Sequence, residues 1–412
     1  MKYSIDFTPV CGYHRPGING ILEYWNAGIV DDGVLNPEVK PFYVEQPDVP
    51  SIHPSIFLSN IPYFFMKISD FDYDLPEERI AQEPTPVRDQ SRMMVLNRSD
   101  GSKKDRHFLE LPEFLREGDV LVINDSRVIP ARLVGKKASG GLIEMLLLRE
   151  RIGESAGSPV AWEVLLRPAK RVDTGTKIFF DAPAEAEIIE RLSDKKWVVR
   201  FETPGPFGDF LVECGRAPLP SYIKRDRRTG KSRRDLERYQ TVYSRFPGSV
   251  AAPTAGLHFS EAVLEKVKLK GIPIAAVTLH VGYGTFLPLE AHNVEDHLME
   301  EEYFQVTEET ASMINSALRV VAVGTTAVRV IESAADDSGK VAATSGCTRL
   351  FIYPGYRFRR VGALITNFHL PKSSLYLLVC AFAGRDFVQG AYSRAIEEKY
   401  RFYSYGDCMM IL

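Results

Sequence analysis

The segment Val320–Ser333, VVAVGTTAVRVIES, constrains the fold more than any other stretch of the chain. Its apolar start predicts a buried strand, and the Gly-Thr-Thr that follows predicts a tight turn into a helix. The same alternation continues from about residue 214 onward, with strands at Ile274–Leu279 and Ala363–Thr366 and with helices capped by Ser260 and Thr307. Alternating strands and helices are typical of an α/β domain.

The rest of the chain divides by composition. Prolines recur through residues 1–65, which predicts an irregular leader without long helices. A different pattern begins at Met66, and residues 134–213 carry short apolar runs separated by turn-forming residues. We therefore expect a leader over 1–65, an α/β domain over 66–133 and 214–412, and a smaller β domain over 134–213.

Composition excludes several classes of protein. The chain has 412 residues, of which 45% are hydrophobic and 25% charged, as in an ordinary globular protein. No run approaches the ~18 apolar residues of a membrane span, and the first residues lack a secretory apolar region. Five scattered cysteines without a C-x-x-C pair indicate reduced thiols. We expect a cytoplasmic protein without a membrane segment or a metal site.

One basic segment stands out against a formal net charge of −3. Residues 224–238 hold eight cations and three anions, a local balance of +5. Such a concentration favours binding to nucleic-acid phosphates, although an exposed loop without a partner would have the same composition. The candidate RNA-binding residues are Lys224, Arg225, Arg227, Arg228, Lys231, Arg233 and Arg234.

Polar residues occupy the turns beside predicted strands. Thr325 and Thr326 offer hydroxyls and free backbone N–H groups at a helix start, which attracts a carboxylate or phosphate. His280 follows a strand beside two glycines, where an imidazole could act as a general base. A helix cap and a structural histidine are the plainer interpretations. The same choice applies to the other candidates in such turns: Asn124, Asp125, Arg127, Arg132, His258 and His369.

From Met66 onward the chain resembles the S-adenosylmethionine:tRNA ribosyltransferase-isomerase family of queuosine biosynthesis. Two departures stand out: Tyr283 replaces a residue that is usually small in the family (HVGAGTF), and Ala327 replaces a frequent serine. The leader has no counterpart in the family, so we expect translation to start at Met66. The motifs that carry the resemblance are NDSRVIPARL (124–133), RYQTVYSRFPGSVAAPTAGLHF (238–259), TLHVGYGTF (278–286), VEDHLMEEEYF (294–304), VGTTAVRVIESAA (323–335), FIYPGYRF (351–358), LITNFHLPKSSLYLLVCAFAG (364–384) and YRFYSYGD (400–407).

The resemblance implies a larger α/β domain built on a β-barrel and a smaller β-rich domain. It implies that S-adenosylmethionine is consumed as a ribosyl donor, with no cofactor. The acceptor is 7-aminomethyl-7-deazaguanine at the wobble position of a tRNA, and the products are epoxyqueuosine-tRNA, adenine and methionine. The implied partners are therefore S-adenosylmethionine and a tRNA anticodon loop. We expect a monomer.

Within this reaction a base must remove a ribose C5′ proton that the sulfonium acidifies. We expect His280 to be the base or a proton shuttle, with His258 and His369 next and Asp125 as an acidic alternative. We expect Thr325, Thr326 and Arg329 to bind the methionine or ribose end, because a guanidinium pairs with a carboxylate. Asn124, Arg127 and Arg132 are further candidates for substrate binding.

Two alternatives stay open at this point. An S-adenosylmethionine-dependent RNA methyltransferase would release S-adenosylhomocysteine, but we find no glycine-rich methyltransferase motif. A non-catalytic tRNA-binding module would release no adenine, and it would leave the motifs outside the basic segment unexplained.

Overall fold

The computed structural model describes residues 66–151, 160–225, 233–286 and 288–412. The predicted leader lies outside these ranges. The helices are α1 (Leu111–Phe114), α2 (Phe207–Cys214), α3 (Arg233–Arg238), α4 (Glu261–Leu269), α5 (Glu308–Ser316), α6 (Gly324–Ala334), α7 (Ser374–Ala383) and α8 (Arg385–Glu397).

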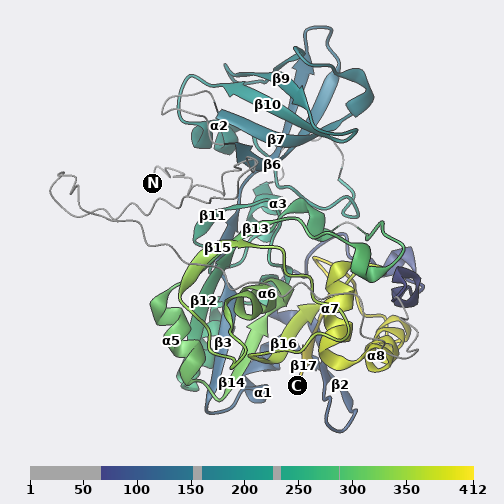
Figure 1. Ribbon diagram of the computed structural model, residues 1–412, viewed down its shortest axis with the longest axis vertical. Coiled ribbons are helices and arrows are strands. Elements are labelled where there is room, and N and C mark those ends of the chain that lie inside the picture. Colours follow the sequence, from purple (N-terminus) through teal and green to yellow (C-terminus); the bar gives the residue numbers. More distant parts are fainter. Residues whose placement is uncertain (1–65, 152–159, 226–232, 287) are drawn as a thin grey trace, which may run out of the picture. The chain divides into compact units, whose positions relative to one another are not determined.

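A nine-stranded sheet organises the larger part of the described chain (Figure 1). In spatial order its strands are β15 (Thr344–Thr348), β13 (Glu302–Val306), β12 (Ile274–Leu279), β3 (Asp119–Asn124), β14 (Arg319–Val323), β16 (Val361–Asn367), β17 (Cys408–Ile411), β1 (Arg92–Leu96) and β2 (Lys103–His107). The four neighbours β12, β3, β14 and β16 are parallel. Their carboxyl ends therefore meet at one edge of the sheet.

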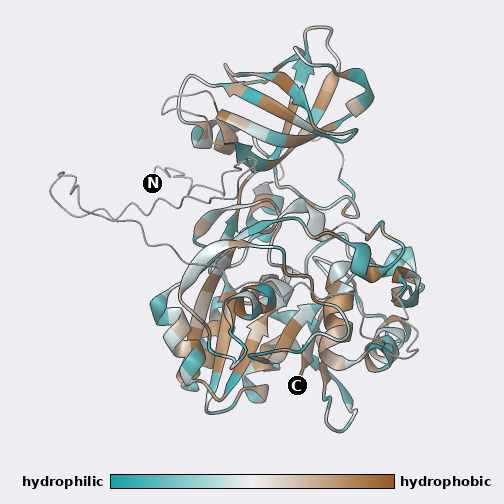
Figure 2. Ribbon diagram, in the orientation of Figure 1, coloured by the Kyte–Doolittle hydropathy of each residue, from teal (hydrophilic) through white to brown (hydrophobic). Residues whose placement is uncertain are grey.

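Both faces of this sheet are covered, which explains why its central strands are continuously apolar. Along β3, Val120 and Val122 belong to one hydrophobic cluster, whereas Leu121 and Ile123 belong to another on the opposite face. Figure 2 shows the apolar colouring of the central strands and of α7. Residues 376–380 of α7 are all buried.

Two predicted helix caps are confirmed. The Ser260 hydroxyl accepts a hydrogen bond from the backbone N–H of Val263 at the start of α4, and Thr307 does the same with Thr310 at the start of α5. Each cap satisfies one backbone donor that the first helical turn leaves without a partner.

Six further strands close into an antiparallel barrel. They are β5 (Arg132–Lys137), β6 (Leu142–Arg151), β7 (Val160–Arg167), β8 (Lys177–Phe179), β9 (Glu185–Arg191) and β10 (Lys196–Glu202). An α/β protein with a β-barrel is thus confirmed, and the barrel has fewer strands than the large sheet. Consecutive hairpins can close on themselves, whereas the parallel strands of the large sheet need long crossovers. Trp162, Trp197 and Phe201 fill the barrel core beside Phe207 and Phe210 of α2.

A short two-stranded parallel ribbon follows β3 in the chain. It pairs β4 (Ser126–Val128) with β11 (Phe246–Ser249).

The cysteines only partly match expectation. Cys380 and Cys408 carry free thiols, but Cys347 is disulfide-bonded, so the expectation of reduced cysteines is wrong at that position. Across the described ranges, no helix has the length and apolar character needed to cross a membrane.

Candidate active site

The carboxyl edge of the parallel strands gathers most of the predicted site residues. Asp125 follows β3, His280 follows β12, Thr325 and Thr326 open α6 after β14, and His369 comes two residues after β16. A small cavity of about 20 Å³ at this edge is lined by groups from three of these loops. Its polar lining residues include Thr285, Thr325, Thr326, Thr366 and His369.

His280 is buried and poised as a neutral imidazole. Its ring stacks on Tyr303 with the centroids 5.6 Å apart and an interplanar angle of 21°. Burial lowers the pKa of His280 to about 4, so the ring is uncharged near neutral pH. Within the described part of the chain, Nδ1 of this ring has no hydrogen-bond partner. A buried, neutral imidazole with an unused nitrogen can accept a proton.

The backbone on either side of His280 is fixed by side chains from other elements. The Asn124 amide donates to the carbonyl of Leu279 and accepts from its N–H, both at 3.1 Å. The Ser249 hydroxyl accepts from the N–H of Val281 at 3.0 Å. Asn124, a predicted substrate-binding residue, is thus engaged with backbone, and this geometry favours a positioning role.

The other two candidate histidines have partners. Nδ1 of His258 lies 2.7 Å from the Ser91 hydroxyl, and its Nε2 lies 3.2 Å from the Asn367 amide nitrogen. Because that amide nitrogen also donates to the carbonyl of Tyr403, Nε2 of His258 is the acceptor and Nδ1 carries the proton. Burial lowers the pKa of His258 to about 4. With both ring nitrogens used, the geometry favours the structural interpretation.

The third candidate histidine, His369, borders the small cavity. Its Nε2 is 2.7 Å from the Thr366 hydroxyl, and the residue lines the small cavity. Burial lowers the pKa of His369 to about 3, so it is neutral near pH 7.

Asp125, the candidate carboxylate after β3, is buried. Its side chain accepts a hydrogen bond from the Thr278 hydroxyl at 2.8 Å. Burial raises the pKa of Asp125, and this effect outweighs the opposing hydrogen bond from Thr278 and the charge of Arg245. A carboxyl group that is easier to protonate can take part in proton transfer.

Arg329 is already paired, which the sequence did not indicate. Its Nη1 forms a buried ion pair with Glu302, and its Nε donates to the carbonyl of Leu350 at 3.0 Å. Glu302 in turn accepts from the N–H of Gly282 at 2.7 Å and from the Thr285 hydroxyl at 3.2 Å. The pair therefore holds the loop after His280. Nη2 of Arg329 stays without a partner among the residues that the structure describes.

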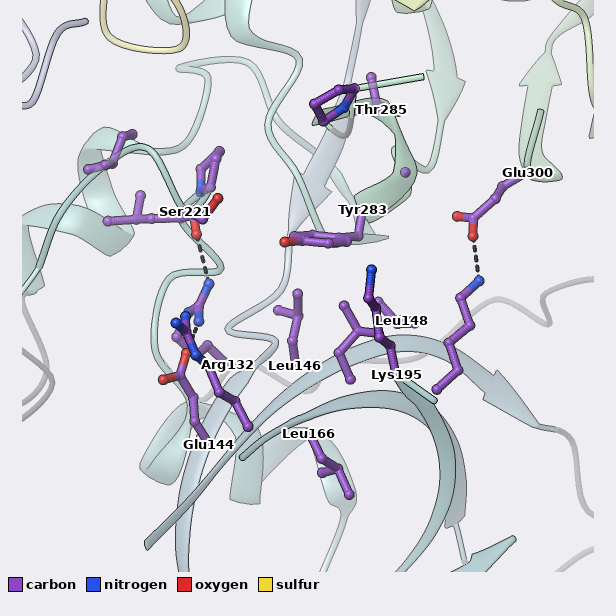
Figure 3. A pocket seen from close by; sticks show the side chains of 18 of the residues that line it. Arg132, Glu144, Leu146, Leu148, Leu166, Lys195, Ser221, Tyr283, Thr285 and Glu300 are labelled. Carbon is purple, nitrogen blue, oxygen red and sulfur yellow. Dashed lines mark hydrogen bonds and ion pairs between the residues drawn. The ribbon is translucent and has the colours of Figure 1, made fainter. Parts of the chain in front are cut away.

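A second, much larger cavity of about 1300 Å³ adjoins this loop (Figure 3). Barrel residues such as Leu146 and Leu166 line one part, and Tyr283 and Glu300 line another. Thr285 lines both cavities, so the loop after β12 separates the strand-end cluster from the larger space. His280 itself lines neither cavity.

Arg132 and Arg127 have different surroundings. Arg132 lines the large cavity, where it pairs with Glu144 and donates to the carbonyl of Leu219 at 2.7 Å. Arg127 is exposed. Their places favour substrate contact for Arg132 more than for Arg127.

The predicted basic segment is partly neutralised. Arg225 pairs with Asp235 at 3.0 Å and with Glu83 at 3.1 Å, and Lys224 pairs with Glu77. Arg234, on α3, is exposed. Arg233 begins α3, while Arg227, Arg228 and Lys231 lie outside the described residues.

Sequence reasoning missed Glu302, Thr285 and Glu144 as site residues. Glu302 and Thr285 lie inside motifs that carried the family resemblance, but their partners come from distant elements. In the ranges that the structure covers, no group of three or more metal-type side chains is suited to hold a metal ion.

The fold and the site define an α/β protein with a polar site outside the carboxyl ends of parallel strands, where ligands bind in open α/β sheets. A family model described as queuosine biosynthesis protein matches residues 68–411. The chain belongs to this family.

Curated relatives match along their whole length. A protein named S-adenosylmethionine:tRNA ribosyltransferase-isomerase from Syntrophus aciditrophicus is 57% identical over 362 residues, which covers 84% of this chain and 100% of that protein. One of the same name from Acetivibrio thermocellus is 48% identical over 352 residues, with the same two coverages. A crystal structure of S-adenosylmethionine tRNA ribosyltransferase from Thermotoga maritima is 38% identical, covers 83% of this chain and 100% of that one, and has a TM-score of 0.47.

Proposed function

We propose that the strand-end cluster and the adjoining large cavity form the active site of an S-adenosylmethionine:tRNA ribosyltransferase-isomerase. The protein transfers and isomerises the ribosyl moiety of S-adenosylmethionine onto the 7-aminomethyl-7-deazaguanine base at the tRNA wobble position. Epoxyqueuosine-tRNA forms, and adenine and methionine are released. The identity of 57% over the full length of a relative of this name supports the assignment of the reaction.

One structural observation carries the assignment of the site. Three buried polar atoms lack a partner within the described chain: Nδ1 of His280 after β12, and Oγ1 of Thr326 and Nη2 of Arg329 on α6. Each such atom costs about 1–3 kcal/mol when it is left without a hydrogen bond. A polar substrate bound at this edge would supply the missing partners.

His280 is our choice for the base. The sulfonium acidifies the ribose C5′ protons, and neutral Nδ1 of His280 accepts one of them. The electron pair that remains forms a C4′=C5′ double bond as the C4′–O4′ bond breaks, and the ring oxygen becomes a C1′ carbonyl as adenine leaves, so the sugar opens. The RNA aminomethyl nitrogen then adds to C4′ and loses a proton, and C5′ closes onto the C1′ carbonyl. The resulting alkoxide displaces methionine, which leaves with the C–S electron pair as the epoxide closes. The Tyr303 ring, 5.6 Å away, stabilises the imidazolium that forms.

The other residues receive supporting roles. Asp125 is the acidic alternative to His280 and His369 is a proton shuttle. Thr325 and Thr326 bind the methionine carboxylate at the start of α6, where backbone N–H groups and the helix dipole favour an anion. Arg329 holds the loop after His280 through its ion pair with Glu302, and its Nη2 can donate a hydrogen bond to the substrate.

A single-turnover assay with S-adenosylmethionine and tRNA bearing the aminomethyl base tests the function. Adenine is followed by chromatography and the modified nucleoside by mass. RNA-dependent release of adenine and methionine together with epoxyqueuosine is expected. Release of S-adenosylhomocysteine would indicate a methyltransferase, and tRNA binding without turnover would indicate a binding module.

We propose further that the protein is a cytoplasmic monomer that needs no cofactor. The sulfonium of S-adenosylmethionine supplies the activation that the reaction requires. Exposed large apolar residues such as Leu269, Leu298 and Leu318 lie on different elements, which favours a monomer. Light scattering and an assay in the presence of a chelator test these statements.

A further inference from the structure

Tyr283 places an aromatic ring in the large cavity without using it for packing against another ring. It begins the short 3-10 helix Tyr283–Phe286 and is flanked by Gly282 and Gly284. Its side chain is half-buried and packs on one side against the barrel core. No aromatic contact or hydrogen bond engages it within the described ranges. A ring in this position leaves a surface free for a ligand.

The backbone under Tyr283 is held firmly. Glu302 accepts the N–H of Gly282 at 2.7 Å. A Cβ at Gly284 would lie only 2.8 Å from Oε2 of Glu300, so that glycine lets the loop pack closely. The ring therefore projects from a fixed base, which lowers the entropy cost of using it for binding.

The part of the cavity that faces the ring is lined by leucines of the barrel, with Lys195 beside them. Figure 3 shows Leu146 and Leu148 of the barrel across from Tyr283. Ion pairs lie on either side, between Arg132 and Glu144 and between Lys196 and Glu300. The middle of the cavity thus suits a flat, apolar face, and its ends suit polar edges.

We propose that Tyr283 stacks on the purine-like ring of a substrate. The inference rests on the proposed function, because that reaction brings two such rings to the protein: the adenine of S-adenosylmethionine and the 7-deazaguanine of the tRNA. Each has a planar face for the tyrosine and polar edges for the flanking ion pairs. A cavity of about 1300 Å³ exceeds the usual volume for one drug-sized ligand, roughly 300–1,000 Å³.

Two substitutions separate the ring from its bulk and from its hydroxyl. Tyr283→Phe keeps the ring, whereas Tyr283→Leu keeps an apolar side chain without an aromatic face. We expect Tyr283→Phe to stay within about 3-fold of wild type. Tyr283→Leu should raise KM for one substrate about 10-fold, the scale of one base stacked on an aromatic side chain, with a smaller change in kcat. The substrate whose KM rises identifies the ring that stacks.

A binding measurement without turnover separates this inference from the proposed function. Proton NMR follows the heterocycle protons of S-adenosylmethionine without tRNA, and of free 7-aminomethyl-7-deazaguanine, on addition of protein. Upfield shifts of one ligand with wild type and Tyr283→Phe, lost in Tyr283→Leu, would support stacking even if no epoxyqueuosine formed. Equal shifts in all three proteins, or no shifts, would overturn it. So would equal KM increases in both variants, since these would point to the hydroxyl.

Discussion

Gly248 lies directly against the imidazole of His280. A Cβ added at this glycine would be 2.7 Å from Cε1 and 2.8 Å from Nδ1 of the ring. The glycine also has a φ of +147°, which other residues rarely adopt. The position of the imidazole therefore depends on the absence of a side chain at residue 248.

Gly248→Ala should displace the His280 ring and lower single-turnover activity on the order of 100-fold, because a shift of about 1 Å at a catalytic group has that effect. Gly205→Ala is the matched control, since a Cβ there would meet nothing within 4 Å. Adenine release measures the change. Normal activity in Gly248→Ala would show that His280 need not hold this position.

His280 and His258 should respond differently to truncation. His280→Ala should lose turnover and keep its stability, because Nδ1 has no partner in the described chain. His258→Ala should lower the free energy of unfolding by about 1–3 kcal/mol, because it leaves Ser91 and Asn367 buried without their partner. Activity and chemical denaturation of both variants provide the comparison. Full turnover by His280→Ala would show that another residue is the base, and Asp125→Asn would then be the next variant to test.

Unfolding should depend on pH through the buried histidines. His258 and His280 have a pKa of about 4 in the folded state, below their usual 6.5. The unfolded chain therefore binds protons that the folded protein does not, and stability falls as the pH falls from about 6.5 to about 4. Each histidine contributes up to about 1.4 kcal/mol per pH unit. His258→Gln should have a correspondingly shallower slope in denaturation experiments, and an unchanged slope would contradict a buried neutral ring.

The pair between Glu302 and Arg329 should matter far more than an exposed pair. Glu302→Gln leaves a guanidinium that is only 4% exposed without its counter-charge, which should cost roughly 3–5 kcal/mol of stability. Asp194→Asn, in the exposed pair with Arg191, should change stability little. Thermal unfolding of the two variants decides the matter. Similar stabilities would mean that solvent reaches Arg329.

Arg234 should contribute to tRNA binding and Arg225 much less. Arg234 is exposed on α3, whereas Arg225 is held by Asp235 and Glu83. Arg234→Ala should reduce the slope of log Kd against log salt by about 0.7–0.9, the contribution of one phosphate contact. Arg191→Ala, an exposed cation of the barrel, is the control. A filter-binding titration at several salt concentrations that gave equal slopes would remove Arg234 from the RNA interface.

Local features of the site could be predicted from the sequence. Helix caps depend on residues three positions apart, so Ser260 and Thr307 were readable from their neighbours alone. Polar residues after apolar strands likewise gave His280 and Thr326 as candidates. These signals are local because the strand and the turn that follows it are adjacent in sequence.

Pairing across the fold could not be predicted in the same way. Arg329 was expected to meet a ligand carboxylate, but its carboxylate partner is Glu302, 27 residues away on strand β13. The Asn124 amide similarly bonds the backbone of Leu279, 155 residues away. Such partners depend on strand order and register, which a single sequence does not specify.

Strand β17 lies between β16 and β1, and it pairs in register with both. In the order of synthesis it is the last of the described strands, while the hairpin of β1 and β2 is among the first. The hairpin therefore leaves the ribosome more than 300 residues before the strand that joins it to the other six strands of the sheet. A translation product that stops before residue 408 lacks β17, so its hairpin of β1 and β2 has no strand through which to join the sheet.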